Sequence, residues 1–380
     1  MSEEQENGFV QVGRYGTNWH QKAWLRKDPN YQGASIPGAR QVFGGPLGSN
    51  NYLDADSSLG LTLDFRRIDD AFSNFVKHLN ACGAATGATL VEAVNMARLG
   101  DPVSAFGGIV TTNRPFDTAS LAALKGELIE VIGAPVINRD VIETLEECAA
   151  KKEKDPDWKN PYGGIKRVLE LGDLNRGDQE FEYKKIRGGD LKIEYSDRLH
   201  LAKSIDTLLD EPRKILCENS GEERPVGVVL GDIGQATQNA GLYEFALKHV
   251  KHCLSNSISI CREYAPGKYQ VLGVGVGQPN RVISAGLAID RAIATLSAEY
   301  DLLKPTNQSK ADYIIEWLKK SVAASEAFYP FSDGPKKLAD AGIRHFLEPG
   351  GALRDKEVIE ALKAYENLVL VFTGVRLFKH

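Results

Sequence analysis

Segments that favour β-strands alternate with segments that favour α-helices along much of this chain, and this alternation restricts its fold more than any other feature. Residues 89–100 carry apolar side chains at helical spacing and stop at a glycine, and residues 106–113 favour a strand. Residues 117–130 open with an aspartate cap and predict a second helix, and residues 131–137 predict the next strand. The alternation predicts an α/β fold.

A chain of 380 residues suits two domains, or one domain with two lobes. Residues 150–200 are charged and broken by Pro and Gly, which predicts a connection with short strands. We expect a first lobe with this connection over residues 1–195 and a second lobe over residues 196–380. Residues 75–80 have a short echo in residues 249–256, and two similar echoes follow in each half, which indicates an internal duplication.

The composition argues against a nucleic-acid-binding, membrane or disulfide-rich protein. The formal net charge of −5 gives no general attraction to nucleic acid or to anionic membranes, so an anionic ligand needs a local basic cluster. Five cysteines without a Cys-x-x-Cys pair are typical of reduced thiols rather than a disulfide framework or a zinc site. The acidic start resembles no targeting peptide, and no apolar run is long enough to span a membrane. The sequence predicts a soluble cytoplasmic protein.

Lys77 and His78 end an apolar stretch and are followed by small residues that include Gly83. One interpretation is a buried histidine beside a lysine whose ammonium reaches solvent. The other is catalytic: an imidazole can move a proton near neutral pH, and an ammonium can stabilise an oxyanion. The dipeptide alone favours the first interpretation.

Other polar stretches carry similar alternatives. Residues 12–21 contain Arg14, Tyr15 and His20, which suit a phosphate or carboxylate, although an ordinary solvated loop has the same composition. Residues 48–56 place Ser49, Asn50 and Asn51 before a helical pattern, either as caps or for recognition of a base or carboxamide.

Two further stretches lie near the end of the chain. Residues 271–282 form a glycine-rich turn from a strand to a helix, and Arg281 opens that helix. Their G-x-G-x-G spacing differs from that of a dinucleotide site. Arg376, Phe378 and His380 follow an apolar strand so directly that we expect a docked C-terminus.

Taken together, these motifs resemble the transformylase half of the bifunctional AICAR transformylase/IMP cyclohydrolase family, where AICAR is 5-aminoimidazole-4-carboxamide ribonucleotide. Their order and spacing match over most of residues 9–145 and 246–380, and only loosely between. The similar stretches are RYGTNWHQ, NNYLDAD, VKHLNACG, DPVSAFGG, LIEVIGAP, LSNSISI, GVGVGQPNRV, SEAFYPFSD, EPGGALRD and TGVRLFKH.

The resemblance implies transfer of a formyl group from 10-formyltetrahydrofolate, the co-substrate, to the 5-amino group of AICAR in purine biosynthesis. It implies two similar cytidine-deaminase-like lobes of three-layer α/β/α type, without a catalytic metal. It also implies a homodimer with active sites across the subunit interface.

Carried over motif by motif, the resemblance implies three groups of residues. The catalytic group is Lys77, His78 and Asn256. The nucleotide-binding group is Arg14, Tyr15, His20, Asn51, Gly107, Glu130, Arg376 and Phe378. The folate-binding group is Ser104, Arg281, Pro330, Phe331 and Asp333.

Several positions depart from the family pattern. Trp19 and Ala81 replace Pro, Asn280 and Ala352 replace Ser, and Glu326 replaces Asp. These changes keep open a paralogous formyltransferase that acts on another amino-heterocycle nucleotide, or a silent nucleotide- or folate-binding partner. The family motifs begin at Arg14, so we expect a monofunctional formyltransferase and a separate IMP cyclohydrolase downstream.

Overall fold

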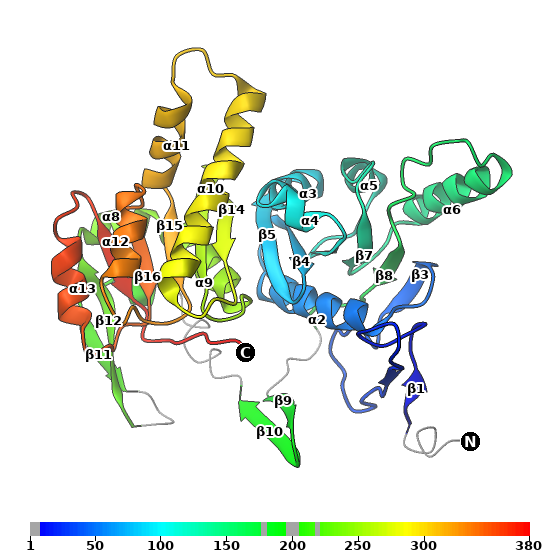
Figure 1. The fold of residues 1–380 in the computed structure, drawn as a ribbon, viewed down its shortest axis with the longest axis horizontal. Helices are drawn as coiled ribbons and strands as arrows, with labels where there is room; N and C mark the ends of the chain where they lie inside the picture. Colours follow the sequence, from blue (N-terminus) through cyan, green and yellow to red (C-terminus); the bar gives the residue numbers. More distant parts are fainter. Residues whose placement is uncertain (1–7, 176–180, 195–204, 217–220) are drawn as a thin grey trace. The chain divides into compact units, whose positions relative to one another are not determined.

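The computed structural model describes residues 8–175, 181–194, 205–216 and 221–380 (Figure 1). It divides into two compact units, Met1–Gln179 and Glu180–His380, and each is described by itself. The boundary expected between residues 195 and 196 lies outside the described residues, so it stays a prediction.

The first unit contains a small strand pair, a larger sheet and its helices. Its strands are β1 (Val10–Gln11), β2 (Trp24–Leu25), β3 (Arg40–Gly44), β4 (Ala71–Lys77), β5 (Asn80–Gly87), β6 (Gly108–Thr112), β7 (Ile129–Ala134) and β8 (Arg167–Glu170). Its helices are α2 (Ser49–Asp64), α3 (Leu90–Leu99), α4 (Pro102–Ala105), α5 (Thr118–Ala123) and α6 (Arg139–Lys154).

The sheet of the first unit is mixed, in the order β5-β4-β6-β7-β8-β3. Strands β6, β7 and β8 are parallel, whereas β4 is antiparallel to both β5 and β6, and β3 is antiparallel to β8. Strand β1 pairs with β2 in a separate ribbon. The α/β class expected from the sequence is confirmed.

Alternating side chains of these strands enter two cores on opposite faces of the sheet. Ile109 and Val131 pack with α2 in one core, whereas Val110 and Ile132 pack in the other. The second core also contains buried residues of α3, α5 and α6. A strand buried on both faces needs apolar residues at successive positions, and β6 and β7 have them.

Local signals set most of the helix boundaries. Thr89 caps α3 by accepting a hydrogen bond from Glu92 N, which confirms the helix expected there. The helix expected over residues 117–130 is wrong in length, because α5 ends at Ala123 and β7 begins at Ile129. Gly126 has φ +83°, a left-handed conformation that ends a helix at little cost. The expected connection is also partly wrong, because α6 runs to Lys154 and β8 belongs to the sheet.

The second unit contains the longest of the described helices, α10. Its strands are β9 (Phe181–Ile186), β10 (Gly189–Glu194), β11 (Arg213–Leu216), β12 (Glu223–Leu230), β13 (Ile258–Ala265), β14 (Lys268–Gly275), β15 (Val322–Ser325), β16 (His345–Glu348) and β17 (Val369–Phe372). Its helices are η1 (Ile205–Leu208), α8 (Ile233–Gln238), α9 (Ala240–Lys251), α10 (Arg281–Leu303), α11 (Lys310–Lys319), α12 (Asp333–Asp340) and α13 (Asp355–Leu362).

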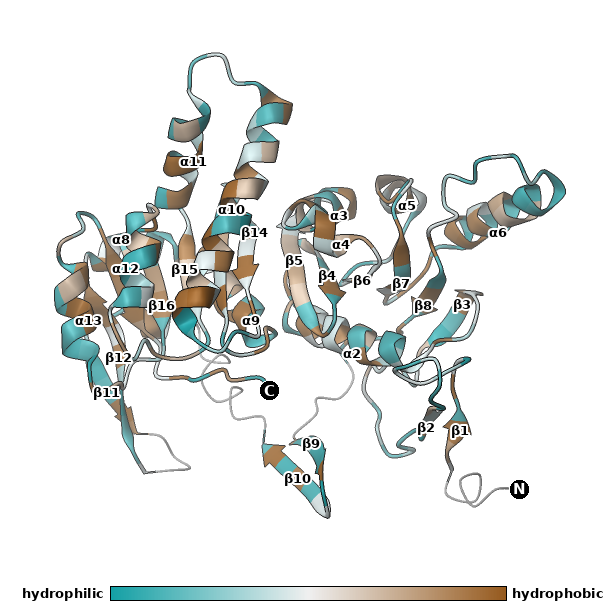
Figure 2. Cartoon of the chain, in the orientation of Figure 1, coloured by the Kyte–Doolittle hydropathy of each residue, from teal (hydrophilic) through white to brown (hydrophobic). Residues whose placement is uncertain are grey.

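The sheet of the second unit has the order β14-β13-β15-β16-β17-β12-β11, and β9 pairs with β10 separately. Strands β15, β16 and β17 are parallel, whereas β13 is antiparallel to β14 and β15, and β12 is antiparallel to β17. Helices α10 to α13 contribute to one apolar core, and α9 packs against β13 and β15. In Figure 2 the buried strand β7 is mostly brown, whereas the exposed edge strand β11 is partly teal and partly brown.

The order β5-β4-β6-β7-β8-β3 of the first unit corresponds, strand by strand, to the order β14-β13-β15-β16-β17-β12 of the second. This correspondence aligns β7 with β16, as the sequence echo over residues 129–136 and 343–351 suggests. The echo between residues 75–80 and 249–256 is wrong, because the first segment is a strand with its turn and most of the second is the end of α9 and a loop. The described part of the chain contains no helix that is both long enough and apolar enough to cross a membrane.

Candidate functional site

Six of the expected residues of the first unit lie at one end of its sheet, where several strands start or stop. Strand register places the ends of β3 and β4 beside the starts of β6, β7 and β8: Gly44 pairs with Arg167, Val76 with Ile109, and Gly108 with Ile129. The residues carried on or next to these ends are Asn51, Lys77, His78, Ser104, Gly107 and Glu130. Strand pairing therefore gathers residues that are up to 79 positions apart, as Asn51 and Glu130 are.

The Lys77–His78 pair lies at the hairpin between β4 and β5. Lys77 is the last residue of β4 and pairs with Asn80, so His78 and Leu79 are the two turn residues. Both have positive φ, +54° and +65°, the pattern of a type I′ turn that normally carries Asn and Gly. The glycine expected for this turn, Gly83, lies inside β5 instead. His78 is exposed, and it is not the buried core histidine of the alternative interpretation.

The ammonium of Lys77 lies at the same end of the sheet, next to the loop before β6. Its Nζ donates to the carbonyl oxygen of Phe106 at 2.7 Å. The next residue, Gly107, has φ +75°, and a Cβ placed there would lie 3.8 Å from Lys77 Nζ. The structure thus brings Lys77 and Gly107 together, and the absent side chain leaves the backbone open beside the cation.

Ser104 belongs to the short helix α4 that precedes Gly107. Its N–H and its hydroxyl both donate to Asp101, at 3.0 and 2.6 Å. The hydroxyl is therefore engaged in capping α4, and its expected contact with folate stays a prediction.

Glu130 is presented by a β-bulge at the start of β7. Gly108 pairs with Ile129 and Ile109 with Val131, so Glu130 is the extra residue between them. Its Oε2 accepts from Arg167 Nη1 at 2.8 Å and from Asn51 Nδ2 at 3.4 Å. Arg167, which is half-buried and binds Glu130, was not predicted from the sequence as a site residue.

The loop over residues 12–21 packs against the start of α2. Gly13 has φ +62°, and a Cβ there would lie 2.8 Å from the Cα of Gly48, the cap of α2. Asn50 Nδ2 also donates to Thr17 O at 3.4 Å. The exposed side chains of the loop, Arg14, Tyr15 and His20, therefore lie on a segment held against a helix N-terminus, where backbone N–H groups favour anions.

The expected residues of the second unit also lie together at one end of its sheet. Ile258 pairs with both Ser325 and Gly275, and Glu348 pairs with Phe372, so the start of β13 lies beside the ends of β14 to β17. The residues carried just beyond these ends are Asn256, Arg281, Pro330, Phe331, Asp333, Arg376 and Phe378.

Asn256 is held by hydrogen bonds to the glycine-rich turn and to α10. Its Nδ2 donates to Gln278 O at 2.9 Å, and its carbonyl oxygen accepts from Ser284 Oγ at 2.8 Å. The side chain is half-buried. These contacts fix the residue on the turn that also leads to Arg281.

A fully buried carboxylate, Glu326, joins three of these segments. Its Oε1 accepts from Arg281 Nη2 at 2.7 Å, and its Oε2 accepts from Ser257 N at 3.0 Å. Its backbone oxygen accepts from Leu377 N at 2.8 Å. Burial raises the pKa of Glu326, although the Arg281 guanidinium opposes that rise. The sequence reading noted Glu326 only as a change from Asp, and its role depends on contacts between distant segments.

The C-terminal segment is docked, as expected. Lys379 N donates to Ser255 Oγ at 3.2 Å, and Ser255 N donates to Lys379 O at 2.9 Å. The guanidinium carbons of Arg376 and Arg281 lie 4.7 and 5.8 Å from the centre of the Phe378 ring. Both cations therefore lie within cation–π range of one aromatic side chain.

The loop after β15 carries the remaining expected residues. Pro330, Phe331 and Asp333 are exposed, and the Arg354 guanidinium lies 4.8 Å from the Phe331 ring. A second buried carboxyl, Glu348 at the end of β16, accepts from Tyr329 N at 2.9 Å and anchors this loop. Burial raises the pKa of Glu348 to about 8, although the Tyr329 N–H opposes that rise.

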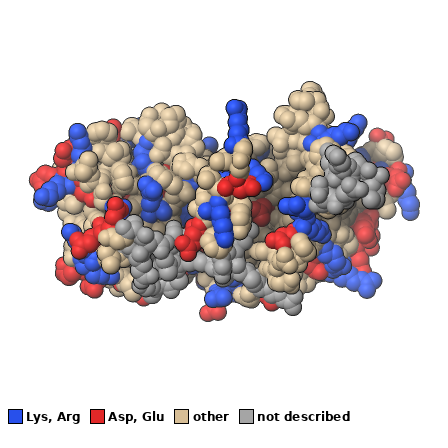
Figure 3. Space-filling view, turned by 90° about the horizontal axis from the view of Figure 1, so that it is seen from below, with Lys and Arg blue, Asp and Glu red and all other residues tan. Residues whose placement is uncertain are grey.

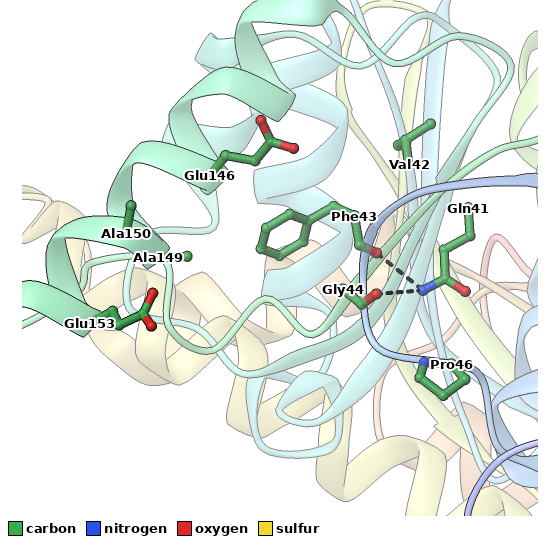
Figure 4. Close-up of a pocket in the computed structure, with 9 residues that line it drawn as sticks. All are labelled: Gln41, Val42, Phe43, Gly44, Pro46, Glu146, Ala149, Ala150 and Glu153. Atoms are coloured by element: carbon green, nitrogen blue, oxygen red, sulfur yellow. Dashed lines mark hydrogen bonds between the residues drawn. The ribbon is translucent and has the colours of Figure 1, made fainter.

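A groove of about 740 Å³ lies elsewhere in the first unit, between β3 and α6 (Figure 4). Val42 and Phe43 line one side and Ala149 and Ala150 the other, and none of the expected site residues lines it. On the face shown in Figure 3, basic and acidic side chains are interspersed. Among the described residues, no group of three His, Cys, Asp or Glu side chains is placed to hold a metal ion.

Comparison with known proteins gives consistent matches. Residues 3–291 match the model of the family described as AICARFT/IMPCHase bienzyme. The bifunctional purine biosynthesis protein PurH of Caldicellulosiruptor saccharolyticus is 33% identical over 373 residues, which are 98% of this chain and 59% of that protein. PurH of Rhodopirellula baltica is 33% identical over 97% of this chain and 58% of its own length.

PurH of Lactobacillus acidophilus is likewise 33% identical, over 97% of this chain and 59% of its own length. The chain thus spans about 59% of the length of the curated relatives that it matches. Because the family model covers most of the sequence, the chain belongs to the AICARFT/IMPCHase bienzyme family.

Proposed function

We propose that the chain transfers a formyl group from 10-formyltetrahydrofolate to the 5-amino group of AICAR, in purine biosynthesis. The products are formyl-AICAR and tetrahydrofolate. Family membership supports this activity, and the observation that carries it is the hairpin at which Lys77 is followed directly by the exposed His78.

The chemistry calls for both groups. The AICAR amine is a poor nucleophile, because its lone pair is delocalised into the ring. When its nitrogen attacks the formyl carbon, a tetrahedral oxyanion forms and the amine must lose a proton, which His78 accepts. Lys77 stabilises the oxyanion, and the bond from the formyl carbon to the folate nitrogen then breaks as that nitrogen gains a proton. Asn256 completes the proposed catalytic group.

The nucleotide contacts follow from charge and position. Arg14 and Tyr15, on the loop against α2, hold the phosphate together with Arg376, since guanidinium groups bind phosphate bidentately. His20 and Asn51 line the nucleotide side. Gly107 and Glu130 contact the aminoimidazole, and Phe378 packs beside it.

The folate contacts belong to the exposed loop after β15 and to its neighbours. Pro330, Phe331 and Asp333 frame the folate together with Ser104 and Arg281. Arg281 donates through Nε to Ser325 and through Nη2 to Glu326, so the remaining nitrogen, Nη1, is the one proposed for folate.

We also propose that the two units are cytidine-deaminase-like lobes of three-layer type that arose by duplication. The matching strand orders and directions support this relationship. The homodimer with active sites at its interface, the separate IMP cyclohydrolase and the cytoplasmic location stay predictions.

The decisive assay follows tetrahydrofolate release by the purified chain when AICAR and 10-formyltetrahydrofolate are supplied. We expect release that depends on AICAR, with formyl-AICAR formed in equal amount. Binding of both compounds without turnover would favour the silent binding partner and overturn the proposed activity.

One observation favours a second candidate, a formyltransferase for another amino-heterocycle nucleotide. Trp19, where the family commonly has Pro, is 87% exposed on the loop that carries Arg14 and Tyr15. A large apolar side chain there can select the ligand. Turnover of analogue nucleotides with kcat/KM above that of AICAR would identify this alternative.

A further inference from the structure

The turn that carries His78 is closed by two non-glycine residues at positive φ, a conformation that leucine seldom adopts. His78 and Leu79 both have positive φ, which brings the Cβ of an L-residue close to its own backbone. Leucine in particular gains nothing from this conformation, since its side chain makes no local hydrogen bond. Such a turn persists only where the surrounding structure holds it.

A carboxylate from α2 holds this turn. Asp54 Oδ1 accepts from Leu79 N at 2.8 Å, and Asp54 Oδ2 accepts from His78 N at 3.3 Å. One side chain thus binds the two successive N–H groups of the turn. Charge-assisted hydrogen bonds of this kind are stronger than neutral ones.

The turn is held from its carbonyl side as well. Ser57, one helical turn after Asp54 on α2, donates through Oγ to Leu79 O at 2.9 Å. Asn80 Nδ2 donates to His78 O at 2.9 Å. Three side chains therefore hold the backbone of both turn residues: Asp54 and Ser57 from α2, and Asn80 from β5.

Within the described ranges of the chain, the hydrogen bonds of His78 involve its backbone N–H and carbonyl, not its ring. The turn backbone determines the direction of the Cα–Cβ bond, and this direction limits the positions that the rotamers of the ring can reach.

We propose that Asp54 is a positioning residue for His78: by binding the two N–H groups of the strained turn, it directs the imidazole toward the reacting amine. This inference rests on the proposed function for its catalytic readout, though not for its structural one. Misplacement of a catalytic group by about 1 Å lowers a rate about 10²-fold, so losing the carboxylate has a large effect on kcat. AICAR binding depends on other residues and changes little.

The test compares Asp54→Ala and Asp54→Asn with a matched control, Asp117→Ala. Asp117 is also a half-buried carboxylate of the first unit, and it accepts from a backbone N–H at 2.8 Å, but at the cap of α5. We expect Asp54→Ala to lower kcat about 10²-fold with KM for AICAR within about threefold of wild type. Asp54→Asn should have a smaller effect, and Asp117→Ala should leave kcat near wild type.

A second substitution separates a positioning role from general loss of structure. Glycine adopts positive φ without steric cost, so Leu79→Gly should recover at least about tenfold of the kcat lost in Asp54→Ala. Unchanged kcat in Asp54→Ala, an equal loss in Asp117→Ala, or no recovery by Leu79→Gly would each overturn the proposal.

Hydrogen exchange gives a readout that needs no catalysis. The amides of His78 and Leu79 should exchange at least about tenfold faster in Asp54→Ala than in wild type, while those of β6 stay protected. If the wild-type chain transfers no formyl group, the proposed function fails, and this exchange still tests the role of Asp54. Equal protection of both amides in variant and wild type would overturn it.

Discussion

Two hairpins occupy corresponding positions in the two units, and they are closed in opposite ways. The β13–β14 hairpin turns at Pro266 and Gly267, residues that suit a tight turn, with only the glycine at positive φ. The β4–β5 hairpin turns at His78 and Leu79, both in the left-handed region. Where a turn only connects strands, favourable residues close it. Where it is proposed to carry a catalytic group, strain is retained and side chains of neighbouring elements offset it.

The two units also place their candidate residues at opposite ends of the parallel strands. In the first unit, Lys77 and Glu130 lie at the amino ends of β6 and β7. In the second, Asn256 and the loop after Ser325 lie at the carboxyl ends of β15 to β17. The same strand order thus carries its candidate residues at opposite ends of the parallel strands in the two units, because the connections at those ends differ.

The largest effect is expected at the strained hairpin. His78→Ala removes the proposed proton acceptor and should lower kcat about 10²- to 10⁴-fold. AICAR binding should persist, because the phosphate contacts at Arg14 are unchanged. Steady-state rates and AICAR titration measure both quantities, and turnover close to that of wild type would remove His78 from the mechanism.

The second prediction concerns Glu348, a buried carboxyl group of the second unit. The carboxyl of Glu348 is fully buried and has its pKa raised from 4.5 to about 8, so the folded state favours its protonated form. Its contribution to stability is complete below pH 4.5 and is lost as the pH rises through about 8. At about 1.4 kcal/mol for each tenfold change in proton affinity, this loss amounts to at most about 5 kcal/mol.

Glu348→Gln should remove most of this dependence, so that its free energy of unfolding changes less than that of wild type between pH 5 and pH 9. Urea unfolding at several pH values measures the difference. Glu360→Gln, an exposed residue of α13 paired with Lys363, is the control and should follow wild type. Parallel pH profiles for Glu348→Gln and wild type would show that Glu348 is ionised in the folded protein at neutral pH.

A smaller effect is expected at the C-terminal segment of the second unit. Arg376→Ala should weaken AICAR binding by about 1.5–3 kcal/mol, the usual value of a charge-assisted contact. Folate binding should change far less. Calorimetric titration of both ligands tests this, and equal losses for the two would contradict a phosphate contact.

The smallest effect is expected at the β13–β14 hairpin of the second unit. Gly267 has φ +69° and nothing within 4 Å of an added Cβ, so Gly267→Ala meets only the conformational penalty. That penalty should lower the free energy of unfolding by about 1–2 kcal/mol and leave kcat unchanged. Chemical denaturation gives the first value. A loss of kcat here would mean that the two hairpins differ less in function than their backbones indicate.

Local sequence signals predicted much of the fold. Thr89 before an apolar-periodic segment predicted α3, and the apolar run that ends at Phe372 predicted β17 and a docked C-terminus. These features are readable because capping and periodicity act within a few residues along the chain. The Lys77–His78 pair was found in the same way, as adjacent residues at the end of a strand.

The tertiary structure decided what depends on contacts between distant residues. Asp54 reaches a turn 24 and 25 residues away, and Glu326 joins Ser257, 69 residues earlier, to Arg281. Arg167 likewise reaches Glu130 only because β7 and β8 pair. A sequence shows which side chains are available for a site, but strand pairing and burial select the ones that meet. For this reason the family resemblance of the sequence named the residues proposed for catalysis, and only the fold revealed that Asp54 holds the turn of His78 and that Glu326 pairs with Arg281.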